Sequence, residues 1–488
     1  MAEPVTRQLA EALSGRRFAD LPALVVEDTQ RSVLDWLGSA LAGSLEPPAR
    51  MAQQVTAGLG LSAEATLFPA GRSSAAGAAL ANGVASHILE LDDIHKASTV
   101  HAAAAVIPAA LAVAEREHAD GQSFLLAVTL GYEAALRIGE AVNPSHYRFW
   151  HPTGTAATFG AAVAAGSLMR LDATQMLDAL GSAGTQAAGL WEFNADGAMS
   201  KHLHPGKAAM NGILAADLAR AGFTGATRIL EGERGFFRAM SEGFDAGRIT
   251  DGLGERWKIS ENCYKVHACC GHTHTAIDTA LTLRNDMTGI KDDALSGPDD
   301  PHLRNTLVTV KAISIDTYGP GFEIVKEMNP RSAYQAKFSL AYCVAVALLE
   351  GRAGLEQFSA DRFSADGVRE RPLANLLART RVRVSDDLSA KYPAAWPARV
   401  RIEMDHGTVL SGGADYPRGN PENPVTTVEL EQKFSALVAP RFGPDVVARA
   451  ITAVHALAEC DDVARLFPAL LGVWSKHFDD GLAATSHA

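Results

Sequence analysis

The sequence is poor in cysteine: five cysteines are spread unevenly over 488 residues, at Cys263, Cys269, Cys270, Cys343 and Cys460. A disulfide framework needs more cysteines at more regular spacing. Their spacings also lack the pattern that holds an iron–sulfur cluster. We therefore expect a reducing, cytoplasmic setting.

Long hydrophobic runs are also lacking. The longest apolar run, Ala102–Ala114, has 13 residues and contains Pro108, whereas a membrane span needs roughly 18 or more. The first residues show no basic segment followed by an apolar one, so no secretory signal is expected. The run is predicted to be a buried helix, and no membrane partner is expected.

Positive charge is in deficit, with 44 lysines and arginines against 56 acidic residues and a net charge of −12. Proteins that bind nucleic acids need a positive footprint to displace counterions from phosphates. The sequence therefore predicts no nucleic-acid partner, although net charge does not exclude a local cationic pocket for a small anion. Apolar residues make up 47% of the chain, enough for a large core.

Three motifs that carry common chemistry are missing from the sequence. They are the P-loop pattern, the dinucleotide-binding G-x-G-x-x-G after a strand, and the G-x-S-x-G nucleophile elbow. Any catalysis must therefore come from ordinary side chains, and no cofactor is expected.

Helical patterns dominate residues 1 to about 262. Apolar residues recur at helical spacing in Glu27–Gly43 and Ser123–Val142. Asp172 and Gln175 form a capping box, and another helix is expected between Gly206 and Gly222. The abundance of Ala and Gly predicts close helix packing.

The pattern changes after Trp257. Alternation typical of strands appears at 307–315, 381–384 and 400–410, around one strong helix at Ser339–Glu350. From Val428 onward the pattern is helical again. The sequence predicts a mainly α fold, with a helical domain formed by 1–262 and 428–488 and an inserted α+β lid at 263–427.

Polar residues interrupt the helical sequence first at Glu90, Asp92, Asp93 and Thr99, followed by His101. A carboxylate here could orient or tune His101 as an acid–base group. The alternative is a helix start stabilised by acidic residues.

Two further clusters follow in the helical part. His151 precedes a small-residue helix, where backbone N–H groups favour anions, although a histidine before proline can be purely structural. Lys201, His202, His204 and Lys207 would together suit a carboxylate. The alternative for this third cluster is an exposed basic loop.

The fourth cluster runs from Lys265 to His274 and contains Cys269, Cys270 and His272. Its composition suggests zinc, but adjacent cysteines with His-x-His do not match the spacing of structural zinc sites. We expect hydrogen-bonding pocket residues here and no metal.

Several stretches resemble the MmgE/PrpD family, which includes 2-methylcitrate dehydratases, cis-aconitate decarboxylases and iminodisuccinate epimerases. The matching stretches, in chain order, are His87–His95, Val106–Ala112, Lys201–Gly206, Ala336–Ala345 and Pro417–Pro424. Each stretch alone is a weak match to the family, but their order and spacing together make the resemblance specific.

The resemblance implies a large helical domain built from both chain ends, a smaller α+β lid, a homodimer and metal-independent, cofactor-free chemistry on a small di- or tricarboxylate. As catalytic residues it implies His101, His151, Lys201 and an acid at Glu90 or Asp92. In the lid it implies pocket positions at Lys265, Thr273 and His274. With the clusters above, the candidate substrate-binding residues are Asp93, Thr99, His204, Lys207, Lys265, Cys270, His272, Thr273 and His274.

The sequence departs from relatives at three points. The first cluster is one residue longer than in the decarboxylase, Ala102 replaces a common proline, and Cys270 falls where the decarboxylase has a histidine. The last point disfavours decarboxylation, although His272 lies close enough in sequence to substitute. We therefore expect a lyase that dehydrates a 2-methylcitrate-like acid. The alternatives are an epimerase of an iminodisuccinate-like acid, a cis-aconitate decarboxylase and a catalytically silent carboxylate-binding protein.

Overall fold

The computed structural model describes residues 3–58, 62–288 and 307–467, which divide into two compact units. The first contains the described residues of 1–88, 92–262 and 426 onward, and the second contains 89–91 and 263–425. Helices make up 59% of the structure, which confirms the mainly α prediction. No helix in the described ranges is long and apolar enough to cross a bilayer.

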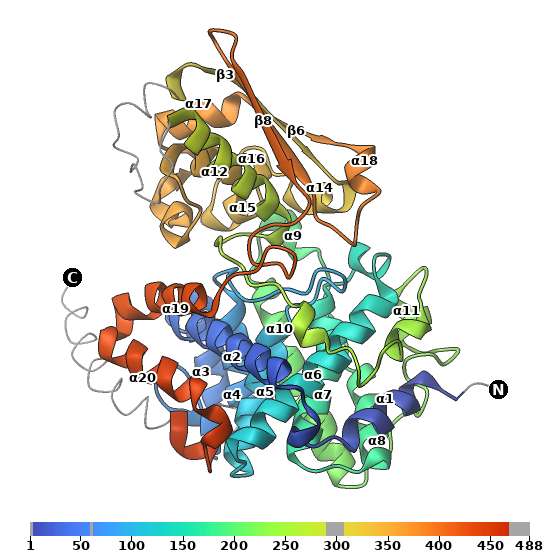
Figure 1. Ribbon diagram of the computed structural model, residues 1–488. Coiled ribbons are helices and arrows are strands. Elements are labelled where there is room, and N and C mark those ends of the chain that lie inside the picture. Colours follow the sequence, from blue (N-terminus) through green and yellow to red (C-terminus); the bar gives the residue numbers. More distant parts are fainter. Residues whose placement is uncertain (1–2, 59–61, 289–306, 468–488) are drawn as a thin grey trace. The chain divides into compact units, whose positions relative to one another are not determined.

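The first unit is almost entirely helical (Figure 1). A two-stranded hairpin, β1 (Ala65–Thr66) with β2 (Arg72–Ser73), accompanies its helices. The helices are α1 (Val5–Ser14), α2 (Ala23–Gly43), α3 (Pro47–Ala57), α4 (Ala75–His87), α5 (Ala103–Arg116), α6 (Gly121–Val142), α7 (Pro152–Leu168), α8 (Ala173–Gly184), α9 (Phe193–Asp196), α10 (Ser200–Arg220), α11 (Phe236–Met240), α19 (Thr427–Phe442) and α20 (Pro444–His455).

Close helix crossings set the positions of the polar clusters. Helix α10 packs on both α4 and α7. Where α10 meets α4, a Cβ added to Gly83 would lie 2.7 Å from Cα of Gly206. Larger side chains at either position would push the helices apart. This crossing brings the end of α4 near the first turns of α10.

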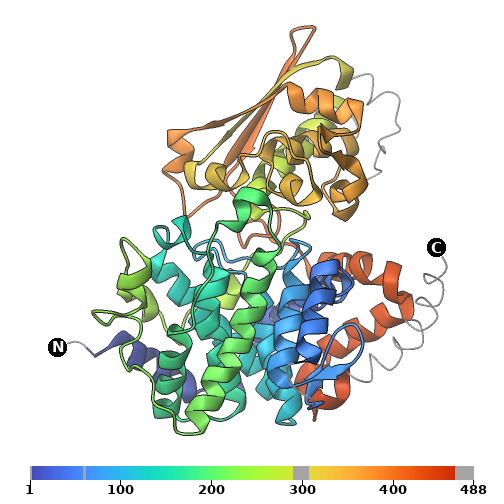
Figure 2. The ribbon, with the colours of Figure 1, turned by 180° about the vertical axis from the view of Figure 1, so that it is seen from behind.

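The C-terminal helices pack on α2, near the beginning of the chain (Figures 1 and 2). Lys433 Nζ of α19 lies 2.5 Å from the Asp35 carboxylate of α2, and Gly38 leaves room for the Phe434 ring. Segments from both ends of the chain therefore share one core.

The second unit contains a four-stranded sheet of order β6-β3-β7-β8, in which β3 pairs parallel with β6 and antiparallel with β7. Along β7, buried and exposed residues alternate, and α12 packs against β7 and β8. Its elements are α12 (His274–Thr288), β3 (Val310–Thr317), α14 (Gly319–Val325), α15 (Ala333–Lys337), α16 (Leu340–Glu350), β4 (Phe363–Ser364), β5 (Gly367–Val368), α17 (Arg371–Ala378), β6 (Thr380–Val384), α18 (Asp386–Ser389), β7 (Ala398–Met404) and β8 (Val409–Ala414).

Short 3₁₀ turns link these elements. They are η1 (Phe18–Asp20), η2 (His146–Arg148), η3 (Ala246–Ile249), η4 (Lys258–Glu261), η5 (Gly271–Thr273), η6 (Leu355–Phe358), η7 (Ala360–Arg362) and η8 (Leu457–Glu459).

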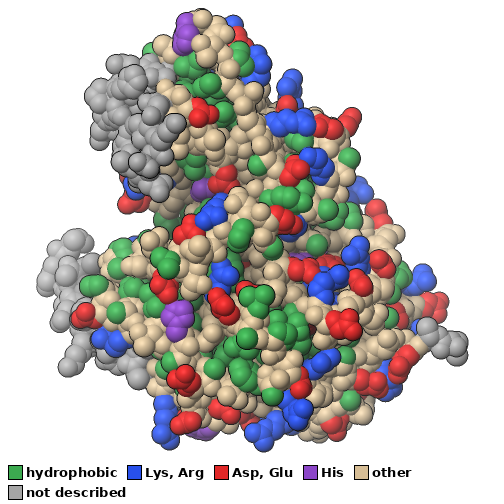
Figure 3. All heavy atoms as spheres, in the orientation of Figure 1, with side chains coloured by type: hydrophobic (Ala, Val, Ile, Leu, Met, Phe, Trp, Pro, Cys, Tyr) green, Lys and Arg blue, Asp and Glu red, His purple; other side chains and the backbone are tan. Residues whose placement is uncertain are grey.

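On the face shown in Figure 3, positive and negative side chains are interspersed.

Two predicted boundaries were wrong. The helix expected from Gly206 begins at Ser200 and continues through Pro205, although a proline inside a helix loses a backbone hydrogen bond and disfavours the helix. The strand expected from Leu307 begins at Val310. By contrast, the Asp172 capping box is confirmed, as is the helix capped by Ser339 and ended by Gly351.

Candidate active site

The segment between α4 and α5 carries the first polar cluster. It folds back on itself because His95 N–H donates to the Val100 carbonyl at 2.9 Å and Thr99 N–H donates to the His95 carbonyl at 2.8 Å. Thr99 takes a left-handed backbone conformation, with φ of 55°, and its hydroxyl donates to the Ser98 carbonyl. The fold-back places His101 immediately before α5.

Asp92 lies between two histidines. Its Oδ2 is 2.7 Å from Nδ1 of His87 and 3.3 Å from Nδ1 of His101. Burial disfavours the charged carboxylate, but the charges of the two imidazoles outweigh burial and hold the pKa of Asp92 well below its ordinary value. One carboxylate therefore orients two buried imidazole rings.

The proton on His101 can be placed from its partner. His101 Nδ1 also lies 2.6 Å from the backbone carbonyl oxygen of Asp93. A carbonyl can only accept, so Nδ1 carries the proton. When the ring is neutral, Nε2 is then the basic nitrogen.

The Asp93 side chain forms hydrogen bonds that stabilise the fold. Its carboxylate accepts from the Tyr132 hydroxyl at 2.6 Å, from Asn262 Nδ2 at 2.6 Å and from the backbone N–H of Ala103 at 3.2 Å. Burial raises the pKa of Asp93 to about 7, against the effect of these donors. The residue predicted to bind substrate thus caps α5 and fixes the carbonyl that holds His101.

His87 ends α4 and faces the other histidines. Its ring centroid is 4.7 Å from that of His101, 5.5 Å from that of His151 and 6.4 Å from that of His202. Its Nε2 is buried and has no hydrogen-bond partner among the described residues. Buried polar atoms are normally satisfied, so this nitrogen points to a ligand.

His151 is the residue before α7, where Pro152 occupies the first helical position. Its Nδ1 lies 3.0 Å from Nδ1 of His204, and the Trp191 ring packs against it. Burial, followed by the charge of His204, holds the pKa of His151 well below its ordinary value. Burial likewise lowers the pKa of His204 to about 3. Both rings are therefore neutral near pH 7, and one donates to the other.

The two lysines of the third cluster differ in their surroundings. Lys201 lies in the first turn of α10 and is 2% exposed, so the alternative of an exposed basic loop was wrong. Lys207 Nζ donates to the carbonyls of Gly154, Gln186 and Ala188, the last at 2.8 Å. These bonds use all three of its donors, so its contacts do not support the predicted role in binding substrate. Burial lowers its pKa to about 8.

We expect Lys207→Met to destabilise the protein by about 1–3 kcal/mol, because three backbone carbonyls, two of them in part-buried hydrogen bonds, lose a charged donor. The KM of the folded enzyme should change little. Urea unfolding measures the first effect and steady-state kinetics the second. A large rise in KM at unchanged stability would return Lys207 to the substrate site.

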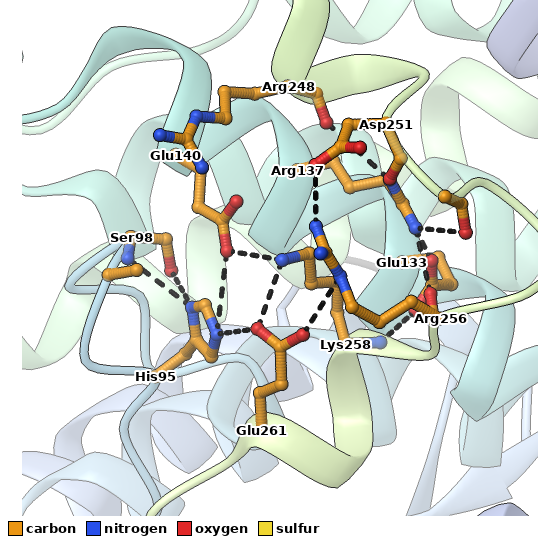
Figure 4. Close-up of polar contacts among 12 residues, drawn as sticks. His95, Ser98, Glu133, Arg137, Glu140, Arg248, Asp251, Arg256, Lys258 and Glu261 are labelled. Atoms are coloured by element: carbon orange, nitrogen blue, oxygen red, sulfur yellow. Dashed lines mark hydrogen bonds and ion pairs between the residues drawn. The ribbon is translucent and has the colours of Figure 1, made fainter. Parts of the chain in front are cut away.

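A network of charged side chains around His95 also stabilises the folded-back segment between α4 and α5 (Figure 4). Lys258 Nζ donates to Glu140 at 2.7 Å and to Glu261 at 3.0 Å. Both carboxylates also lie 3.6 Å from Nε2 of His95, whose Nδ1 contacts Ser98 Oγ at 2.9 Å. The network ties the segment ahead of His101 to α6 and η4.

The second unit holds the other predicted residues, with Glu90 among them. Lys265 Nζ lies 3.3 Å from the Glu90 carboxylate and 3.2 Å from its carbonyl oxygen, and both side chains are buried. Lys337 Nζ donates to the carbonyl of the neighbouring Leu89. Glu90 is therefore neutralised by a lysine, whereas Asp92 orients histidines.

The residues of the fourth cluster are also buried and bonded. His272 Nδ1 lies 2.5 Å from the Tyr318 hydroxyl. Thr273 Oγ1 donates to the Cys270 carbonyl, and His274 Nε2 lies 3.3 Å from the Cys269 carbonyl. Burial is the main cause that lowers the pKa of His274.

Two sets of three side chains in the described ranges bring potential metal-ligand atoms within 4.8 Å of one another: His87 with His101 and His151, and His95 with Glu140 and Glu261. Neither set contains a cysteine. In the second set, Lys258 already supplies the positive charge.

Comparison with known proteins decides the family. The model of the MmgE/PrpD N-terminal domain matches residues 7–248, and that of the MmgE/PrpD C-terminal domain matches 267–459. The chain belongs to the MmgE/PrpD family.

Curated relatives within this family carry decarboxylase names. A cis-aconitate decarboxylase-like protein, oryM of Aspergillus oryzae, is 26% identical, over 96% of this chain and 97% of its own. The cis-aconitate decarboxylase of Aspergillus terreus is 27% identical over 89% of each chain. The human cis-aconitate decarboxylase is 26% identical, over 97% of this chain and 95% of its own.

Sequence reasoning missed one residue of this histidine cluster and undervalued another. His87 closes an apolar, Ala-rich helix and reads as the helix end, yet it contacts Asp92 and faces His101 and His151. His202 faces His87 across the α4–α10 crossing. The five-residue separation of His87 from Asp92 could have indicated a pair, because the helix ends at His87 and the chain can then turn back.

Proposed function

We propose that this MmgE/PrpD protein is a lyase that moves a proton α to a carboxylate of a small di- or tricarboxylic acid. The observation that carries the proposal is the buried group of His87, Asp92, His101 and His151. One carboxylate orients two imidazoles there, and a neutral histidine faces them. General acid–base catalysis needs positioned groups that can take up or release a proton near neutral pH.

His101 and His151 are the proposed proton-transfer pair. The depressed pKa of His151 keeps this ring unprotonated at neutral pH, as a base requires. His101 has its Nδ1 proton fixed by Asp92 and the Asp93 carbonyl, so its Nε2 exchanges a proton with the substrate. Their ring centroids are 6.1 Å apart, so the two rings are close enough to act on the same small substrate.

Lys201 is proposed to hold a substrate carboxylate. Its ammonium is buried, and its charge contributes to lowering the pKa of His151, so it lies within electrostatic reach of that ring. Removal of an α-proton builds negative charge on the carboxylate, which a fixed cation stabilises.

We expect Lys201→Met to raise KM by about tenfold or more, because a charge felt in both the ground state and the transition state is lost. A fall in kcat should accompany it, because removal of the α-proton gives an enediolate-like species with one more negative charge than the substrate. Initial-rate kinetics provide the measurement, with Lys207→Met as the matched control. An unchanged KM in the Lys201 variant would refute this role.

For the reaction type, we propose elimination of water from a 2-methylcitrate-like acid. One histidine of the pair takes the α-proton, and the other protonates the leaving hydroxyl so that it departs as water. The second candidate is decarboxylation of cis-aconitate, which the names of the relatives favour. Against it stands Cys270, at the position of a decarboxylase histidine, and the neighbouring His272 is already bonded to Tyr318.

A panel of acids followed by proton NMR separates the candidates. The panel contains 2-methylcitrate, citrate, cis-aconitate and iminodisuccinate, with CO₂ measured in parallel. We expect an unsaturated product and water from a hydroxy acid, without CO₂. Itaconate with stoichiometric CO₂ from cis-aconitate would instead establish the decarboxylase and overturn the argument from Cys270.

A further inference from the structure

We propose that His87, His101 and His151 bind a divalent transition-metal ion such as Zn²⁺, and that the bound ion inhibits the enzyme. The site itself does not depend on the proposed function, whereas the inhibition rests on it.

The first argument is geometric. One ring nitrogen of each histidine lies within 4.8 Å of the others. In a tetrahedral zinc site with Zn–N distances of about 2.0–2.1 Å, ligand nitrogens are about 3.4 Å apart. Shifts of about 1 Å or less in each nitrogen would therefore close the three rings on one ion. Three histidines leave the fourth position open to water or a carboxylate.

The second argument is the state of His87. Its Nε2 is buried and has no partner among the described residues, while its Nδ1 is held by Asp92 at 2.7 Å. A buried nitrogen without a partner costs free energy. A metal ion would satisfy it, and so would a substrate oxygen, which is why the two should compete.

The third argument lies behind the rings. Histidines that bind metals commonly donate their other N–H to a carboxylate or a backbone carbonyl, which fixes the tautomer and makes the ligating nitrogen more basic. Asp92 provides this carboxylate to both His87 and His101, and the Asp93 carbonyl provides a second acceptor to His101. Behind His151, Nδ1 of His204 lies 3.0 Å from Nδ1 of the His151 ring.

Charge and ligand type select the ion. The charge of Lys201 reaches His151 and opposes a cation, whereas the Asp92 carboxylate offsets it. Imidazole nitrogens suit Zn²⁺, Co²⁺, Ni²⁺ and Cu²⁺, while Mg²⁺ and Ca²⁺ prefer oxygen ligands. We therefore expect the site not to bind Mg²⁺.

Inhibition follows from shared atoms. The proposed proton transfers use Nε2 of His101 and a ring nitrogen of His151, and a coordinated nitrogen has no lone pair left for a proton. Chelation should accordingly leave activity unchanged or raise it.

The test uses the untagged, metal-stripped full chain. Titration with Co²⁺, followed by visible absorption, and with Zn²⁺, followed by calorimetry, should show one ion per chain. His87→Ala should weaken binding by more than the 10–100-fold typical of losing an outer-shell partner, and Asp92→Asn should fall within that range. His118→Ala, at a histidine whose side chain is 73% exposed, is the control and should bind normally. Circular dichroism checks the fold, and His87→Asn is a second variant if the alanine variant unfolds.

The outcomes separate the two proposals. The metal site would be overturned if the protein shows no stoichiometric metal binding, or if a folded His87 variant binds as well as the unchanged protein. The proposed function would remain intact in either case. Stoichiometric binding by a protein that turns over no acid would leave the site intact and remove the proposed function. Activity lost on chelation and restored by Zn²⁺ would overturn the claim that the ion inhibits.

Discussion

Replacing His101 by alanine should lower kcat by about 10²–10⁴-fold while KM changes little, because loss of a positioned acid–base group costs this much. The structure explains why His101 should be so sensitive. Its Nδ1 is fixed by the Asp92 carboxylate and the Asp93 carbonyl, so its Nε2 presents one protonation site in one direction. Alanine removes that nitrogen.

Single-turnover and steady-state kinetics on the acid found active in the panel provide the measurement. His101→Gln tests whether a polar group without acid–base capacity suffices, and it should be equally impaired. His118→Ala, at an exposed histidine, should retain full activity. A near-normal kcat in His101→Ala would exclude the assignment.

Asp92→Asn should be the second severe change, with kcat lowered by at least about 10²-fold. In a Ser-His-Asp triad the equivalent change costs about 10⁴-fold, because the amide favours the wrong histidine tautomer. Here one carboxylate oxygen contacts Nδ1 of both His87 and His101. In asparagine that position holds either an NH₂ group, which cannot accept from them, or an oxygen without the negative charge. Loss of the negative charge beside the two rings should also shift the pH–rate profile toward lower pH. A purely structural role would not produce that shift.

Glu90→Gln is the matched comparison. Glu90 forms an ion pair with Lys265 inside the second unit, so its loss should destabilise that unit without moving the pH profile of catalysis. The sequence left Glu90 and Asp92 as equal candidates. If Glu90→Gln shifts the profile and Asp92→Asn does not, the roles are reversed.

The fold was predictable where the pattern is local. The helix expected at Glu27–Gly43 is α2, Ala23–Gly43, and the strand expected at 381–384 is β6, Thr380–Val384. Apolar residues recur at the helical period in the first segment and alternate in the second, and capping residues mark several helix ends. The start of α10 was missed because Pro205 and Gly206 usually end a helix, whereas here the crossing of Gly206 with Gly83 stabilises it.

The site was predictable in part, for a different reason. Asp92, His101, His151 and Lys201 interrupt apolar sequence and so attract attention. Lys207 attracted the same attention, but the sequence does not tell which carbonyls its ammonium reaches. His87 belongs to an Ala-rich helix end, and its pairing with Asp92 depends on how the chain turns after α4. Contacts that depend on a turn or on a helix crossing are difficult to predict from the sequence.

The central claim is proton transfer α to a carboxylate, and solvent-deuterium exchange tests it most directly. The untagged enzyme is incubated in deuterium oxide with each acid of the panel, and proton and deuterium NMR follow the α-position. The account predicts enzyme-dependent deuterium at one carbon α to a carboxylate, present with His118→Ala and lost with His101→Ala. Exchange absent from every acid, or undiminished in a folded His101→Ala variant, would contradict it.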